Sequence, residues 1–173
     1  TGAGVSTESG VPDFRSAGGV WSRYDPMEVA SIDGFRRDPE RVWEFYGRRL
    51  GVLGRVEPNP AHRVLAALEA AGLVDAVITQ NVDGLHTRAG SRDVVEVHGS
   101  LALASCPDCG RTEPRERVVQ LLPLPRCEAC GAVLKPGVVM FGELLPAAAL
   151  ERAVELAAAA ALLLLVGSSL QVW

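Results

Sequence analysis

The feature that most limits how this chain can fold is a set of four cysteines in two C-x2-C pairs. Residues 110 to 126 separate the pairs CPDC and CEAC, and the cysteines are Cys106, Cys109, Cys127 and Cys130. Four thiolates at this spacing can close a tetrahedron around Zn²⁺, and the glycine after each pair lets the turn fold back on the metal. Because four sulfur ligands leave no coordination position open for water, we expect this zinc to be structural.

Two other interpretations of the cysteines stay open on the sequence alone. Two disulfide bonds would need an oxidising compartment, and no feature of the chain indicates secretion, so we expect reduced thiols and a cytoplasmic protein. A zinc ribbon that binds nucleic acid normally carries interleaved basic and aromatic residues, which this chain with its net charge of -4 lacks. We therefore expect no nucleic-acid partner. The sequence does not predict an oligomeric state.

The apolar content is typical of a globular protein with a substantial core, since 48% of the 173 residues are hydrophobic. The longest apolar run, 156–167, is shorter than the roughly 18 to 20 residues that a membrane span needs. We expect this run to be a helix end followed by a buried strand, and we expect no membrane partner.

Two helix starts are marked by a capping side chain followed by proline, at Asp38-Pro39 and Asn59-Pro60. They predict helices over about 39–53 and 60–72. Near-continuous apolar runs alternate with these helices, which predicts an α/β fold with a parallel sheet covered on both faces. The cysteine-containing stretch 105–135 is inserted into this pattern as a separate module. The predicted strands are DAVIT (75–79), VVEV (94–97), GVVMF (137–141) and ALLLLV (161–166).

Polar residues concentrate where these strands end, which is where an open parallel sheet binds its ligands. TQNVDGLH follows the first predicted strand, HGS the second and GSSLQV the last. At the amino end, Gly2, Gly4 and Gly10 can bring backbone amides close to a pyrophosphate, although glycine-rich turns are often only turns. The PDFR motif beside them adds an aromatic lid and a cation, Phe14 and Arg15, to this candidate phosphate site.

The motifs GAGVS, GVPDFR, TQNVDGLH, HG, the two C-x2-C pairs, KPGVVMFGE and GSSL occur in this order. The chain thereby resembles the sirtuin family of NAD-dependent protein lysine deacylases over essentially its whole length. The resemblance implies a Rossmann-like NAD-binding domain (1–20, 59–100 and 136–173), a helical part of a small domain (21–58) and a zinc-binding module (101–135). It also implies truncation at both ends, and we expect this piece alone to be unstable and to bind NAD poorly.

The resemblance implies NAD and structural Zn²⁺ as cofactors and acylated-lysine proteins or peptides as partners. His98 matches the catalytic histidine, and imidazole suits a base that activates a ribose hydroxyl because its ordinary pKa lies near neutral pH. Asp83 is implied to hold the nicotinamide carboxamide, and Asn81 to orient the ribose or a water. Ser168 replaces the usual threonine and keeps the hydroxyl. The residues implied to bind NAD are Gly2, Ala3, Gly4, Asp13, Phe14, Arg15, Gln80, Asn81, Asp83, Gly167, Ser168 and Ser169.

The spacing of the remaining polar residues adds two expectations. Asn81 and Asp83 stand two apart after a strand, so their side chains should point into one pocket. His62 lies in the first turns of a helix and His86 closes TQNVDGLH, and we expect structural roles for both, with His86 capping its loop.

The residues implied to bind the substrate lie in two places. Val138, Val139, Phe141 and Gly142 should present backbone to an extended peptide, with Met140 where many relatives carry tryptophan. In WEFYGRRL, Tyr46 and Arg49 match the Tyr-x-x-Arg of the sirtuin subgroup that removes succinyl, malonyl and glutaryl groups. Residues three apart are neighbours on a helix, so both can reach one carboxylate. Periodicity alone favours the alternative of an arginine that lies on a solvated helix face.

The function that the resemblance implies is removal of acyl groups from protein lysines, with release of nicotinamide and O-acyl-ADP-ribose and a preference for succinyl or malonyl groups. Three alternatives stay open: a plain deacetylase, a mono-ADP-ribosyltransferase, and a non-catalytic module that binds NAD and zinc.

Overall fold

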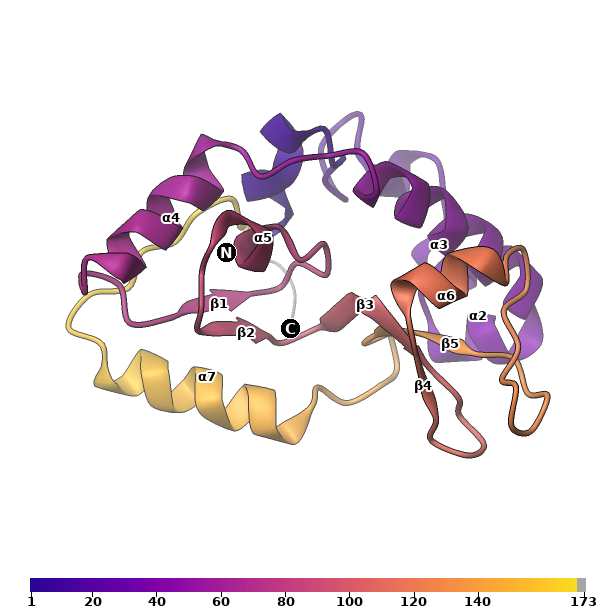
Figure 1. Cartoon of the computed structure of the whole chain (residues 1–173). Coiled ribbons are helices and arrows are strands. Elements are labelled where there is room, and N and C mark those ends of the chain that lie inside the picture. The colour runs from indigo at the N-terminus through magenta and orange to yellow at the C-terminus, as the bar shows by residue number, and fades with distance from the viewer. Residues whose placement is uncertain (171–173) are drawn as a thin grey trace.

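The computed structural model describes residues 1–170, which form two parts (Figure 1). One part holds a pair of parallel strands with helices on either side of it. The other holds an antiparallel three-stranded sheet, the cysteines and the helices within residues 26–53.

The parallel pair consists of β1 (Val77–Thr79) and β2 (Val94–Glu96). Thr1 lies along β1, because its amino group donates to the Ile78 carbonyl at 2.6 Å and the Gln80 N–H donates to the Thr1 carbonyl at 3.0 Å. In Figure 1, α4 (Pro60–Ala70) and α5 (Leu85–Ala89) lie on the β1 side and α7 (Ala147–Ala159) on the β2 side. The strands predicted at 75–79 and 94–97 are thus confirmed, with narrower bounds.

The helices begin where their capping residues predict. The Asp38 carboxylate accepts the Arg41 N–H at 3.0 Å at the start of α3 (Pro39–Leu53). The Asn59 side chain accepts the Ala61 N–H at 2.9 Å at the start of α4. The shorter helices are α1 (Pro26–Val29), α2 (Ile32–Arg37), η1 (Ala3–Ser9) and η2 (Val20–Ser22), the last two being 3-10 helices.

The cysteine-containing part is built on a sheet of order β4-β3-β5, with β3 (Gly99–Ser105), β4 (Thr112–Pro114) and β5 (Lys135–Val138) antiparallel, followed after β4 by α6 (Arg115–Gln120). The prediction that 137–141 is a strand of the parallel sheet is wrong. The strand ends at Val138 and pairs antiparallel with β3. An apolar run indicates that a segment is buried, but it does not indicate the direction of the strand that pairs with it. Here the run contains Met140, which is buried at 2% exposure.

The prediction of a buried strand at 161–166 is also wrong. Helix α7 ends at Ala159, and the following residues form no strand, with Leu162 to Leu165 exposed. Within residues 1–170 the only backbone hydrogen bonds of residues 161–167 join the Val166 and Gly167 carbonyls to the N–H groups of Gly2 and Gly4, so no neighbouring strand covers the leucines. No helix in the described chain is long and apolar enough to cross a membrane.

Helix α3 shares its core with the cysteine-containing part. Trp43 is 1% exposed, and its indole N–H donates to the Leu134 carbonyl at 2.7 Å. Leu134, Val118 and Cys127 belong to the same buried cluster. This packing fixes the orientation of α3, so that its Tyr46 and Arg49 line the cavity described next.

Candidate active site

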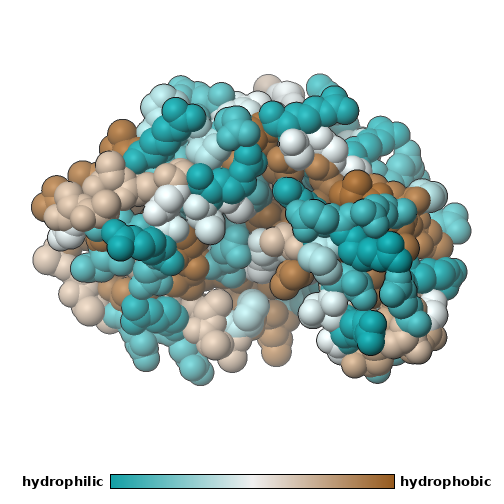
Figure 2. Space-filling view, in the orientation of Figure 1, coloured by the Kyte–Doolittle hydropathy of each residue, from teal (hydrophilic) through white to brown (hydrophobic). Residues whose placement is uncertain are grey.

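A cavity of about 440 Å³ is lined by residues from both parts of the chain. Its walls are the end of β1, His98, α3, the loop 11–16 (the PDFR loop) and residues 138–143 (the 138–143 segment). Figure 2 shows a mainly hydrophilic face, with apolar residues visible in the hollow between its two lobes.

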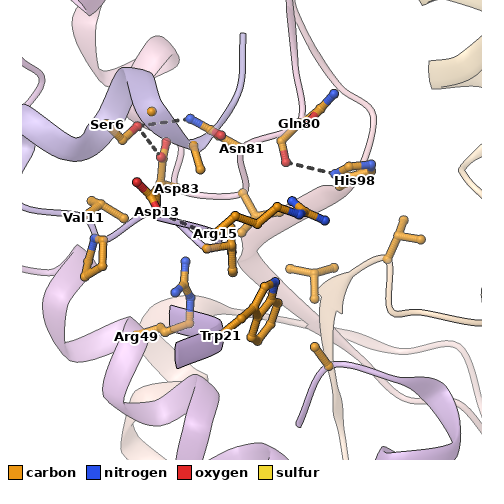
Figure 3. A pocket seen from close by; sticks show the side chains of 18 of the residues that line it. Ser6, Val11, Asp13, Arg15, Trp21, Arg49, Gln80, Asn81, Asp83 and His98 are labelled. Carbon is orange, nitrogen blue, oxygen red and sulfur yellow. Dashed lines mark hydrogen bonds between the residues drawn. The ribbon is translucent and has the colours of Figure 1, made fainter. Parts of the chain in front are cut away.

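His98 stands between β2 and β3, half-buried at the cavity wall (Figure 3). Its Nδ1 lies 3.1 Å from the Gln80 carbonyl oxygen. Because a carbonyl can only accept, Nδ1 carries the proton in this contact and Nε2 keeps its lone pair. Burial lowers the pKa of His98, although the bond to Gln80 opposes this in part. The ring is therefore a neutral base at pH 7.

Ser6 joins Asn81 and Asp83 in one hydrogen-bonded group (Figure 3). The Ser6 hydroxyl donates to Asp83 Oδ2 at 2.7 Å and accepts from Asn81 Nδ2 at 3.1 Å. Asp83 Oδ1 also accepts the Leu85 N–H at 2.9 Å. The two side chains expected to share a pocket thus meet at one buried hydroxyl.

His62 supports this group from behind. The Asn59 N–H donates to His62 Nδ1 at 3.3 Å, which leaves the ring proton on Nε2, 3.3 Å from the Ser6 hydroxyl. Burial lowers the pKa of His62, so the ring stays neutral. His62 therefore caps α4, as a structural histidine should, and also contacts a residue of the cavity.

His86 does not cap its loop, and that expectation is wrong. It is 2% exposed within α5, where its Nε2 lies 2.9 Å from the Thr1 hydroxyl and its ring centroid 4.8 Å from that of His62. Burial and then the nearby His62 lower the pKa of His86 to about 4. The motif ends in a helix, not an open loop, so the ring packs inward.

The PDFR loop is held in a fixed turn. Asp13 Oδ1 accepts the N–H groups of Ser16 at 2.9 Å and Arg15 at 3.1 Å, and the Ser16 bond is the main reason that the pKa of Asp13 is lowered. Phe14 packs on Trp21 with ring centroids 5.0 Å apart. Figure 3 shows the Arg15 side chain extending toward the His98 side of the cavity.

The glycines near the amino end form a close backbone contact with residues 167–168. The Gly4 N–H donates to the Gly167 carbonyl at 2.8 Å. A Cβ on Gly4 would lie 2.9 Å from that oxygen, and a Cβ on Gly167 would lie 2.1 Å from the Val5 nitrogen. Only glycine permits the backbones at Gly4 and Gly167 to lie this close. The contact places both glycines, together with Ser168 and Ser169, at the cavity. Such a cradle fits a diphosphate group.

Arg49 lies at the opposite side of the cavity from His98 (Figure 3). Its guanidinium lies over two aromatic rings. Its guanidinium carbon is 4.8 Å from the Phe14 centroid and 5.7 Å from the Phe45 centroid. No carboxylate among residues 1–170 forms an ion pair with it. Burial raises the pKa of the neighbouring Tyr46, so its hydroxyl remains a hydrogen-bond donor.

The 138–143 segment closes the cavity beside His98. The Val139 N–H donates to the His98 carbonyl at 2.8 Å, and the Phe141 N–H donates to the Ala30 carbonyl at 2.9 Å. Within the described residues the Gly142 backbone makes no hydrogen bond, and its φ is +90°. The segment is thus fixed on one side and offers free backbone at Gly142.

The four cysteines lie together away from the cavity, with all Sγ atoms within 4.8 Å of one another. The shortest separations are 3.4 Å for Cys106–Cys130 and 3.5 Å for Cys109–Cys127. A tetrahedral site with Zn–S bonds of about 2.3 Å has S···S edges of about 3.8 Å, so the cluster fits Zn²⁺. The alternative of two disulfides is wrong, since all four cysteines are free.

Each C-x2-C pair forms the same turn around the proposed ion. The Gly110 N–H donates to the Cys106 carbonyl at 3.0 Å, and the Gly131 N–H to the Cys127 carbonyl at 2.8 Å. Both glycines have positive φ, which explains their position after each pair. A hydrogen bond from the backbone N–H of Cys109 is the main reason that the pKa of Cys106 is lowered to about 7. The lower pKa favours the thiolate.

The residues predicted for NAD and substrate all line the cavity except Gly2, which lies behind Gly167 and Ser168. Several other lining residues were not predicted, among them Ser6, Trp21 and Glu143. Ser6 and Glu143 belong to the quoted motifs GAGVS and FGE, so the signal was present. Trp21 has no sequence signal beyond its apolar character.

These features define a two-part α/β protein with a neutral histidine base at the wall of a largely apolar cavity and a four-thiolate metal site. The model of the Sir2 family matches residues 2–173, and the chain belongs to this family.

Named relatives agree with this assignment. The "NAD-dependent protein deacylase 2" of Pyrobaculum aerophilum is 53% identical over 169 residues, which is 98% of this chain and 68% of that protein. The "NAD-dependent protein deacetylase" of Chromobacterium violaceum is 51% identical over 175 residues, covering 99% of this chain and 70% of that protein. The expected enzyme class, an NAD-dependent protein deacylase of the sirtuin type, is therefore confirmed at the level of the family.

Solved structures confirm the fold. A Sir2 homolog–NAD complex superposes with a TM-score of 0.82 at 48% identity, over 90% of this chain and 60% of that one. Sir2Tm bound to a propionylated peptide gives a TM-score of 0.80 at 40% identity, over 91% and 64%. The chain thus spans less than two thirds of these solved relatives.

Proposed function

We propose that the full protein containing this chain removes acyl groups from protein lysines with NAD as the co-substrate. The observation that carries the proposal is the neutral His98, whose Nε2 lone pair is available at a cavity that also holds Asn81, Asp83 and the PDFR loop. Relatives at about half identity are named NAD-dependent protein deacylases, which supports the same reaction.

Each wall of the cavity has a task in this reaction. Bound NAD supplies a ribose carbon from which nicotinamide can leave. The Gly4–Gly167 cradle holds the diphosphate, and the group Ser6–Asn81–Asp83 orients the nicotinamide ribose end. His98 accepts a ribose hydroxyl proton on Nε2, and its Nδ1–H bond to Gln80 stabilises the imidazolium that results.

We also propose a preference for acyl groups that end in a carboxylate. Arg49 is a partly buried cation without an ion-pair partner in residues 1–170, and it lines the cavity with the protonated Tyr46 hydroxyl. A guanidinium that lies on the Phe14 and Phe45 rings keeps its planar edge for bidentate binding of a carboxylate.

The size of the preference follows from the strength of one charged contact. A hydrogen bond to a charged group contributes about 1.5 to 3 kcal/mol, which corresponds to roughly a 10- to 150-fold preference for succinyl-lysine over acetyl-lysine. Acetyl-lysine leaves Arg49 unpaired, but the contacts with the two rings remain, so acetyl turnover is weaker and not abolished.

The test is to incubate the full-length protein with NAD and with succinyl-, acetyl- or unmodified peptides of one sequence, and to identify products by mass spectrometry. A deacylase yields free lysine and O-acyl-ADP-ribose. ADP-ribose attached to protein, with no deacylated peptide, would show a transferase and overturn the proposal. Equal kcat/KM for the two acyl-peptides would leave deacylation standing and remove the acyl preference.

A further inference from the structure

Lys135 is the only lysine in a chain with 17 basic residues, and its ammonium group is fully bonded. It donates to the Val138 carbonyl at 2.7 Å, to Glu143 Oε2 at 2.9 Å and to the Pro136 carbonyl at 3.3 Å. An ammonium group has three N–H donors, and these three acceptors use all of them. The side chains of Lys135 and Glu143 are only 13% and 27% exposed, so solvent screens the pair weakly.

The pair holds the side of the 138–143 segment that does not face His98. Val139 and Phe141 bond to the His98 and Ala30 carbonyls on one side. Val138 and Met140, which alternate with these two residues, contact the Lys135–Glu143 pair through their backbone. The Val138 carbonyl accepts from Lys135, and the Met140 N–H donates to Glu143 Oε2 at 2.8 Å. The Glu143 N–H returns a bond to the Met140 carbonyl at 3.0 Å.

We propose that Lys135 and Glu143 are positioning residues that clamp the 138–143 segment and thereby place the acyl-lysine peptide relative to His98. The inference rests on the proposed deacylase function and adds two residues to its substrate site. With the Val138 carbonyl and the Met140 N–H taken by the clamp, the groups left for the peptide backbone are the Val139 carbonyl and the N–H and C=O of Gly142, which make no bond within residues 1–170.

The chemistry of the contact requires lysine at this position. A tetrahedral ammonium at the end of a flexible stem can reach three acceptors that surround one point, whereas a planar guanidinium presents its donors in a fixed fork. Arginine at 135 would keep the charge opposite Glu143 and lose one of the two carbonyl contacts. We therefore expect Lys135→Arg to fall between the wild type and Lys135→Met.

The experiment measures steady-state kinetics and hydrogen exchange on the full-length protein, with acetyl-peptide and NAD varied separately. In Lys135→Met we expect the KM for the peptide to rise about tenfold, the effect of losing one charged contact, while kcat and the KM for NAD change less than about twofold. The matched control is Arg152→Met, which breaks the exposed Arg152–Asp93 pair on α7 and should leave all three constants unchanged.

Hydrogen exchange tests the clamp even if the protein turns out not to be a deacylase. Because Met140 N–H protection depends on Glu143, we expect Lys135→Met and Glu143→Gln to speed exchange in peptides that span 138–143 by about fivefold or more, with α4 unchanged. Unchanged exchange in the segment would overturn the clamp. A parallel fall of kcat, NAD affinity and melting temperature would also overturn it, since that pattern marks a general structural role. Faster exchange in a protein without turnover would sink the deacylase proposal alone.

Discussion

The Gln80 carbonyl accepts the Nδ1–H of His98 at 3.1 Å, and this contact leaves Nε2 as the nitrogen that can take a proton. Burial lowers the pKa of His98 below its ordinary 6.5, so the imidazolium deprotonates at a more acidic pH than a free histidine. Only the neutral ring can act as a base. We expect kcat/KM for NAD to rise with pH through a pKa below 6.5 and to be flat above it, as measured between pH 5 and 8. A rise centred above pH 7 would contradict this environment.

Replacement of the base tests its role directly. His98→Ala should lower kcat for deacylation by about 10²- to 10⁴-fold, because a positioned general base contributes an effect of that size. The side chain is only half-buried, so zinc content and melting temperature should stay close to those of the wild type. Near-normal turnover in a folded variant would remove His98 from the chemistry.

Arg49 decides the acyl preference if it binds the terminal carboxylate. Arg49→Met keeps an unbranched stem over Phe14 and Phe45 and removes the charge. We expect kcat/KM for a succinyl-peptide to fall about 10- to 150-fold and that for an acetyl-peptide to change little. Arg48, which is paired with Glu44 on the surface, provides the control Arg48→Met, with both substrates unaffected. Equal losses on both peptides in Arg49→Met would assign Arg49 to the scaffold.

Ser6 is the hydroxyl on which Asn81, Asp83 and His62 converge. Ser6→Ala leaves these buried groups short of a partner, so we expect the free energy of unfolding to drop by about 1 to 3 kcal/mol. The released Asn81 and Asp83 should also misplace the nicotinamide end, with kcat/KM for NAD falling roughly tenfold or more. Thr7→Ala, at an exposed neighbouring hydroxyl, should change neither quantity. Unaltered NAD kinetics in Ser6→Ala would limit Ser6 to stability.

Much of the site was predictable because short motifs fix local chemistry. Proline after Asp38 and Asn59 located two helix starts, and the cysteine spacing located the metal site, since each depends on neighbouring residues only. The polar residues after β1 lie together at the cavity, as predicted, because ligand sites of parallel sheets form at the carboxyl ends of the strands.

The predictions that failed concern contacts between segments that are distant in the sequence. The runs 137–141 and 161–166 are both apolar, yet one enters an antiparallel sheet and the other forms no strand in the described chain. Apolar content reports the tendency to be buried, but strand direction and pairing depend on which segment is adjacent in space. The Lys135–Glu143 pair was missed for a related reason, since its meaning comes from the backbone groups that it occupies.

The metal site supports several walls of the cavity, so loss of the metal should lower activity by disturbing the fold. Strand β3 begins directly after His98, β5 runs into the 138–143 segment, and Trp43 of α3 bonds to the Leu134 carbonyl beside the cysteines. Cys127→Ser in the full-length protein should abolish stoichiometric zinc, measured by elemental analysis, and lower the melting temperature with a parallel loss of deacylation. Asp108→Asn, an exposed change in the other C-x2-C turn, should retain one zinc per chain and full activity. A zinc-free Cys127→Ser protein with a wild-type melt would show that the four thiolates do not hold this fold together.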